Sequence, residues 1–140
     1  MRTKTIDHFL RATWQAVSKM YNEEASKYGA SMATGLALLS IDTEEGVPST
    51  SLGPRMGMES TSLSRTLKTM ENQGLIRREP NPEDGRSVLI KLTKEGLEKR
   101  SLSKEVVIHF NKSIEEAVSN KDLESFYKAV SYTHLRAHET

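Results

Sequence analysis

The side chains best suited to contact another molecule form a run of hydroxyls that leads into two cations. Four of the five positions from 60 to 64 are serine or threonine. These residues are poor helix formers, so their concentration needs an explanation. Hydroxyls can donate to phosphates and base edges, and arginine can pair bidentately with guanine O6 and N7. The alternative is an ordinary surface helix with a serine-rich start, and this segment alone favours that alternative. The candidate contacts are Ser60, Thr61, Ser62, Ser64, Arg65 and Lys68.

A second candidate group lies around a segment rich in turn-forming residues. Residues 79–85 read Glu-Pro-Asn-Pro-Glu-Asp-Gly, and Arg86 follows them. An arginine on a protruding hairpin can enter a narrow minor groove, where the potential is most negative. Asp84 can hold Arg86 through a charge-assisted bond, and Arg77 can bind a phosphate or an acid of the hairpin. Hairpin tips are also charged for solubility alone, so that alternative stays open.

Other chemistry has little support in the sequence. His134 and His138 are four residues apart and can share a helix face with Glu139, but two histidines are a weak metal signal. The absence of cysteine excludes disulfides, thiolate zinc sites, cysteine nucleophiles and thiol redox sensing. A Ser-His-Asp order, a glycine-rich phosphate loop and an HExxH motif are also missing. We therefore expect no enzyme activity, no metal and no cofactor.

Size and charge narrow the class of protein further. The 140 residues fit one domain, and the net charge is only +1. Between Arg55 and Lys94 there are eight basic and five acidic side chains, an excess that a mixed solvated surface would also explain. No apolar run approaches the roughly 20 residues that span a bilayer, and the first residues do not resemble a signal peptide. We interpret the protein as cytoplasmic.

The spacing of apolar residues predicts the elements that position these groups. In the segment Met58–Gln73, Leu63, Leu67 and Met70 form an apolar stripe opposite the hydroxyls. Leu36, Leu38 and Leu39 are core candidates of an earlier helix, and residues 42–48 are predicted to be a turn. The predicted helices are 5–28, Met32 to about Ile41, Ser49–Met56, Met58–Gln73, a helix capped by Thr93 that runs to about Ser119, and a last helix from Lys121; the predicted strands are 75–78 and 87–92.

Two details qualify this pattern. Pro54 lies inside the third helix, and proline costs a helix interior about 3 kcal/mol, so that helix either starts near Ser51 or is bent. The two strands form a β-hairpin that directly follows a helix-turn-helix, which is the arrangement of a wing. The fold class predicted is mainly α with a small β-hairpin wing.

The stretch from Met58 to Gly96 resembles the MarR (multiple antibiotic resistance regulator) family of winged helix-turn-helix regulators. The most diagnostic part is an acid–x–Arg wing pattern followed by a strand and Leu-Thr-x-x-Gly. The similarity in helix order covers residues 5 to about 130. The matching pieces are Ser-Leu-Ser-Arg-Thr-Leu (62–67), Met-Glu-Asn-Gln-Gly-Leu-Ile-Arg-Arg (70–78), Asn-Pro-Glu-Asp-Gly-Arg-Ser (81–87) and Leu-Thr-Lys-Glu-Gly (92–96).

The resemblance implies a homodimeric, ligand-responsive repressor on a pseudo-palindromic double-stranded operator. Asp84 and Arg86 match the family's wing pair, and Arg65 matches its recognition-helix arginine. A small lipophilic or aromatic effector is implied as well, although each pocket candidate taken singly is more typical of core or dimer interface. These candidates are Trp14, Tyr21, Tyr28, Met32 and Leu36. The alternative function is a protein-interaction or small-molecule-binding module without DNA binding.

We expect residues 1–140 to form a single domain of this type. Residues 31–92 are its winged helix-turn-helix lobe, and residues 5–28 and 93–130 are its dimerisation helices. Residues 131–140 break the amphipathic pattern that the family's last helix normally continues. We interpret this stretch as a foreign tail joined after Val130.

Overall fold

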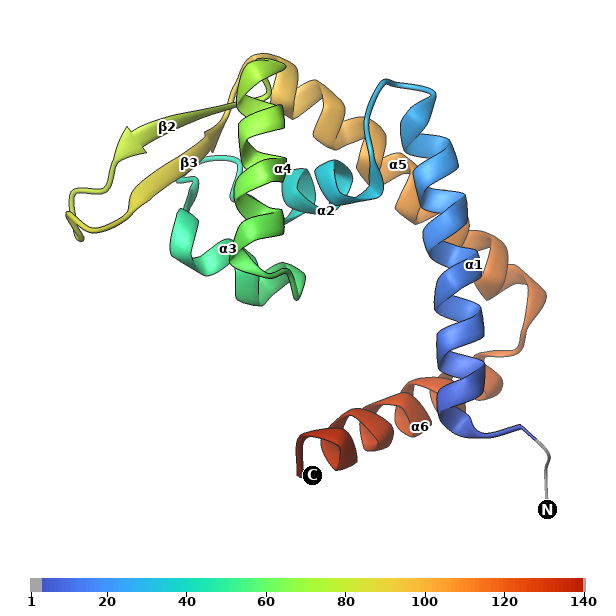
Figure 1. The fold of residues 1–140 in the computed structure, drawn as a ribbon. Helices are drawn as coiled ribbons and strands as arrows, with labels where there is room; N and C mark the ends of the chain where they lie inside the picture. Colours follow the sequence, from blue (N-terminus) through green and yellow to red (C-terminus); the bar gives the residue numbers. More distant parts are fainter. Residues whose placement is uncertain (1–3, 140) are drawn as a thin grey trace. The chain divides into compact units, whose positions relative to one another are not determined.

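The computed structural model describes residues 4–139 (Figure 1). It is mainly helical with one small sheet, which agrees with the predicted fold class. It divides into two compact units, Met1–Val106 and Val107–Thr140, which we describe separately. None of the described helices combines the length and apolar character needed to cross a membrane. The elements are α1 (Ile6–Ser26), α2 (Met32–Ser40), β1 (Val47–Pro48), α3 (Ser49–Met56), α4 (Ser60–Asn72), β2 (Ile76–Pro80), β3 (Val88–Leu92), α5 (Lys94–Ala117) and α6 (Asn120–Glu139).

Side-chain caps explain where three of the helices begin. The hydroxyls of Thr5 and Ser31 each accept a hydrogen bond from a main-chain N–H three residues later, at 3.3 and 3.2 Å. The Thr93 hydroxyl does the same for the Gly96 N–H at 3.0 Å. Each bond satisfies an amide that the first helical turn leaves unpaired, and replacing such a cap by alanine costs about 1 kcal/mol. The caps predicted at Ser31 and Thr93 are confirmed.

The core of the first unit lies between α2, α3, α4 and the sheet. Leu38, Leu52, Met70 and Ile90 are almost fully buried there. Burying one such side chain contributes about 1.5–3 kcal/mol. Leu36, predicted to be a core residue, is instead 37% exposed, because it faces away from this cluster.

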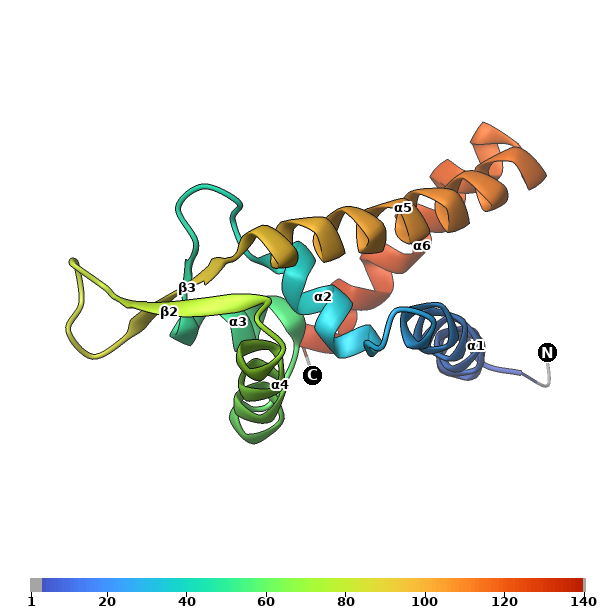
Figure 2. The same ribbon diagram turned by 90° about the horizontal axis from the view of Figure 1, so that it is seen from above.

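The sheet has three antiparallel strands in the order β1-β3-β2, with β2 on an edge. Figure 2 shows the β2–β3 hairpin extending away from α2 and α4. Ile76 pairs with Leu92 at one end of the hairpin and Pro80 with Val88 at the other. Val47 pairs with Ile90, so the prediction that residues 42–48 are all turn is wrong at its last two positions. Gly46 precedes them at φ 76°, where a Cβ would collide with the Ile90 carbonyl oxygen.

The third helix has its predicted bounds, Ser49–Met56. α3 begins at Ser49 and holds Pro54 as its sixth residue, so the late start near Ser51 is wrong. Pro54 has no N–H to donate to the Thr50 carbonyl, so α3 lacks that helical hydrogen bond. The last helix, α6, continues through Glu139 and so includes most of the stretch after Val130 that we interpret as a foreign tail.

Candidate nucleic-acid interface

α3 and α4 form a helix-turn-helix around Gly57. Gly57 adopts φ 64° and ends α3, as a left-handed C-cap residue commonly does. The Met58 N–H then donates to the Gly53 carbonyl at 3.0 Å. A Cβ on Gly53 would lie 3.2 Å from the Met58 carbonyl oxygen, so the turn packs closely on α3. The turn therefore fixes the direction in which α4 begins.

α4 divides into one buried and one exposed side. Leu63, Leu67 and Met70 are buried in the core, as their spacing predicted. Glu59, the N-cap residue, makes no side-chain cap bond, which leaves first-turn amides of α4 open to other acceptors. The predicted contact residues of this helix are all exposed: Ser60, Thr61, Ser62, Ser64, Arg65 and Lys68.

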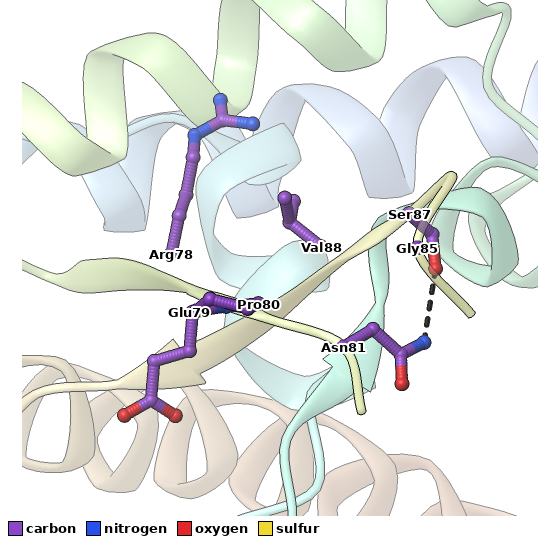
Figure 3. A pocket seen from close by; sticks show the side chains of 7 residues that line it. All are labelled: Arg78, Glu79, Pro80, Asn81, Gly85, Ser87 and Val88. Atoms are coloured by element: carbon purple, nitrogen blue, oxygen red, sulfur yellow. Dashed lines mark hydrogen bonds between the residues drawn. The ribbon is translucent and has the colours of Figure 1, made fainter. Parts of the chain in front are cut away.

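The tip of the β2–β3 hairpin, residues 81–87, is held by a set of short local hydrogen bonds. The Asp84 carboxylate accepts from the Arg86 main-chain N–H at 2.9 Å, and the Asp84 carbonyl accepts from the Ser87 N–H at 3.2 Å. The Asn81 amide donates to the Ser87 hydroxyl at 2.9 Å and accepts from the Glu83 N–H at 3.0 Å (Figure 3). Asp84 thus holds Arg86 through the main chain, while the arginine side chain is exposed.

The cations along the hairpin are engaged with acids. Glu79 accepts from Lys91 at 2.9 Å, and its second oxygen lies 3.5 Å from Arg77 Nε. These two cations, Lys91 first, hold the pKa of Glu79 below its ordinary value. Arg77 also donates to the Leu92 carbonyl at 3.3 Å. Arg77, a predicted DNA contact, therefore already has two partners in the hairpin.

Arg78 connects the hairpin to α4. Its Nε lies 3.3 Å from a carboxylate oxygen of Glu71, near the end of that helix. Sequence reasoning missed this link, because it depends on the direction in which β2 leaves α4 and no residue spacing encodes that.

Arg78 also borders an open hollow of about 330 Å³ on the hairpin (Figure 3). The other lining residues are Glu79, Pro80, Asn81, Gly85, Ser87 and Val88.

The predicted effector residues gather only in part around the α1–α2 connection. Tyr21 and Met32 are half-buried, and burial raises the pKa of the Tyr21 hydroxyl. Asn22 accepts from the Met32 N–H at 2.9 Å and so ties α1 to the start of α2. Trp14 and Tyr28 are about half exposed, at 54% and 47%.

Residues 31–88, which carry α2, the helix-turn-helix and the start of β3, match the family model described as the MarR family. By this match the middle of the chain is similar to the MarR family. A relative named as the organic hydroperoxide resistance transcriptional regulator of Bacillus subtilis is 37% identical over 87 residues. That alignment covers 62% of this chain and 59% of the relative, so the chain spans about three fifths of the relative's length.

Solved structures share the fold at lower identity. MepR from S. aureus, in a crystal structure with DNA, superimposes with a TM-score of 0.85 at 14% identity. That match covers 95% of this chain and 98% of MepR. CouR from Rhodococcus jostii, solved with p-coumaroyl-CoA, gives 0.80 at 21% identity and covers 91% and 90% of the two chains. These matches establish that the chain shares its fold with MepR and CouR.

Proposed function

We propose that this protein is a sequence-specific, double-stranded DNA-binding transcriptional regulator. The observation that carries the proposal is the exposed hydroxyl and cation side of α4 beside a hairpin whose tip is ordered around Arg86. The relatives are named as transcriptional regulators, and MepR was solved with DNA. The same features support a binding protein rather than an enzyme.

In the proposed complex, α4 enters a major groove and the wing reaches the neighbouring minor groove. Arg65 reads a base, Lys68 neutralises phosphate, and the hydroxyls of the first turn approach the backbone. Arg86 enters the minor groove, with Asp84 shaping its turn. Arg77 exchanges its contact with Glu79 for a contact with a phosphate. The free energy lost with the Glu79 contact is small, because exposed ion pairs contribute at most about 1 kcal/mol.

We propose further that two copies bind one pseudo-palindromic operator. Apolar side chains that a single chain leaves exposed support this: Ile6 and Trp14 on α1, and Phe126 and Tyr127 on α6. Residues 5–28 and 93–130 would supply the dimer contacts, and 31–92 the DNA-binding lobe. Two-fold symmetry then places the half-sites about one helical turn, roughly 34–36 Å, apart.

The same dimer offers a means of regulation. A small lipophilic or aromatic effector would bind near Trp14, Tyr21, Tyr28, Met32 and Leu36, as the aromatic acyl group of CouR's ligand suggests. Binding that changes the distance between the two lobes would release the operator, which makes the protein a repressor. Because the target is chromosomal DNA, we assign its action to the cytoplasm.

Selection of bound duplexes from a random library at physiological salt tests the proposal. We expect an enriched inverted repeat with one-turn spacing. Affinity for that repeat should fall steeply as salt rises, since each neutralised phosphate releases counterions. A folded dimer that enriches no sequence would overturn the proposal and favour an interaction module without DNA binding.

A further inference from the structure

The C-terminal end of α4 is closed by a Schellman motif. Gly74 adopts φ 75°, and its N–H donates to the Glu71 carbonyl at 3.0 Å. The Leu75 N–H donates to the Met70 carbonyl at 2.9 Å. Both bonds are those that a left-handed C′ glycine makes possible, and they leave the Gly74 and Leu75 carbonyls directed away from α4.

Both of these carbonyls accept hydrogen bonds from Thr93, the N-cap residue of α5. The Thr93 main-chain N–H donates to the Leu75 carbonyl at 3.0 Å. The Thr93 hydroxyl donates to the Gly74 carbonyl at 2.5 Å while it accepts from the Gly96 N–H at 3.0 Å. One hydroxyl therefore joins the last turn of α4 to the first turn of α5. We call Gly74, Leu75, Thr93 and Gly96 the α4–α5 joint.

Gly96 makes this joint a contact between backbones. It is buried, and a methyl group at its Cα would overlap the Leu75 carbonyl and lie 3.3 Å from the Leu92 side chain. Apolar side chains can move between rotamers without losing contact, whereas backbone groups that touch and share hydrogen bonds have little such freedom. The joint therefore connects the end of α4 to the start of α5 through direct backbone contact and shared hydrogen bonds.

We propose that the Thr93 hydroxyl and Gly96 are positioning residues that fix the direction of α4 relative to α5. Along the chain, α5 leads from the winged helix-turn-helix to the helices assigned to the dimer. Through α5, the joint sets the distance between the two recognition helices and hence the half-site spacing that the protein accepts. This inference rests on the proposed DNA-binding function.

The test compares spacing preference in full-length variants. Thr93→Val removes the hydroxyl at nearly constant volume, Thr93→Ser keeps it, and Thr43→Val is the matched control at an exposed turn position. Each protein is titrated with the selected operator and with duplexes whose half-sites are one base pair closer or further apart. Titration at stoichiometric concentrations gives the active fraction, so that unfolded protein does not affect the dissociation constants. Thr93→Ala replaces the valine variant if the latter does not fold.

We expect Thr93→Val to lose roughly tenfold in preference for the selected spacing, because it removes a part-buried hydroxyl that makes two hydrogen bonds. Thr93→Ser and Thr43→Val should keep the wild-type preference. If the wild-type protein binds its operator and Thr93→Val prefers the same half-site spacing equally strongly, the proposed role of the joint is wrong and the proposed function stands. A wild-type protein that binds no duplex overturns both.

Discussion

Arg65 lies on the exposed side of α4, between the buried positions Leu63 and Leu67. Arg65→Ala should lower operator affinity by about 1–3 kcal/mol and relax base preference at one position of each half-site. Arg65→Lys keeps the charge but loses the planar fork, so it should retain non-specific affinity and lose the same base preference. Binding titrations against single-base operator variants measure both. Equal losses on every sequence would reassign Arg65 to a phosphate.

Arg86 is the exposed cation of an ordered turn, and its role should depend on the groove it meets. Arg86→Ala should weaken binding mainly at operators with A·T-rich flanks, where the narrow minor groove concentrates negative potential. The measurement is the affinity ratio between duplexes with A·T and G·C flanks around the same core. Glu83→Gln, a change at an exposed residue of the same tip, is the control and should leave this ratio unchanged. A similar ratio in Arg86→Ala and the wild type would argue against minor-groove insertion.

The wing tip keeps its form through Asn81, whose side chain contacts Ser87 and the Glu83 main chain. Asn81→Ala removes both bonds, each worth about 1 kcal/mol, and should loosen residues 82–87 without unfolding the core. Hydrogen exchange should become faster at the Ser87 amide and stay unchanged at Leu67. Operator affinity should fall toward that of Arg86→Ala. Unchanged exchange at the tip would show that the turn holds without Asn81.

The elements predicted best from sequence are those with local signals. α2 and α5 begin where they were predicted to begin, because Ser31 and Thr93 cap them through bonds to near neighbours. The exposed side of α4 followed from the spacing of its buried leucines. β1 escaped prediction because two residues show no alternation, and its pairing partner Ile90 lies far along the chain.

The candidate site was predicted unevenly for the same reason. The exposure of Arg65 and Arg86 is a local property, and the sequence indicated it. Whether a cation is free or paired depends on contacts between elements, and the partners of Arg77 and Arg78 came only from the structure. A pocket around the effector candidates would require elements distant in sequence to come together, and Trp14 and Tyr28 are about half exposed in the single chain.

At the scale of the whole molecule, two surface carboxylates make the free energy of unfolding depend on pH in the acidic range. The Glu45 and Glu44 amides hold the pKa of Asp42 below its ordinary value, and Lys91 does so for Glu79. A carboxyl with a depressed folded pKa stabilises the fold above its unfolded pKa, and this contribution is lost as pH falls through the folded value. The free energy of unfolding should therefore decrease from the ordinary pKa values of 3.8 and 4.5 downward.

Urea unfolding at fixed protein concentration, at neutral pH and at about pH 3, measures this loss. The double variant Asp42→Asn and Glu79→Gln should lose less stability on acidification than the wild type, because it lacks the charges that must be protonated. Glu124→Gln, at an exposed position of α6, is the control and should behave as the wild type does. An equal loss in the double variant would place the acid sensitivity elsewhere.

The strand order β1-β3-β2 leaves β2 as an edge strand whose outer row of backbone groups has no neighbour within the sheet. Such an edge is a template for pairing with another chain, and proteins guard against that with charges and proline. β2 carries Arg77, Arg78 and Glu79 and ends at Pro80, which has no N–H to offer. The cations that suit this hairpin to a polyanion thus also protect the unbound protein from edge-to-edge aggregation.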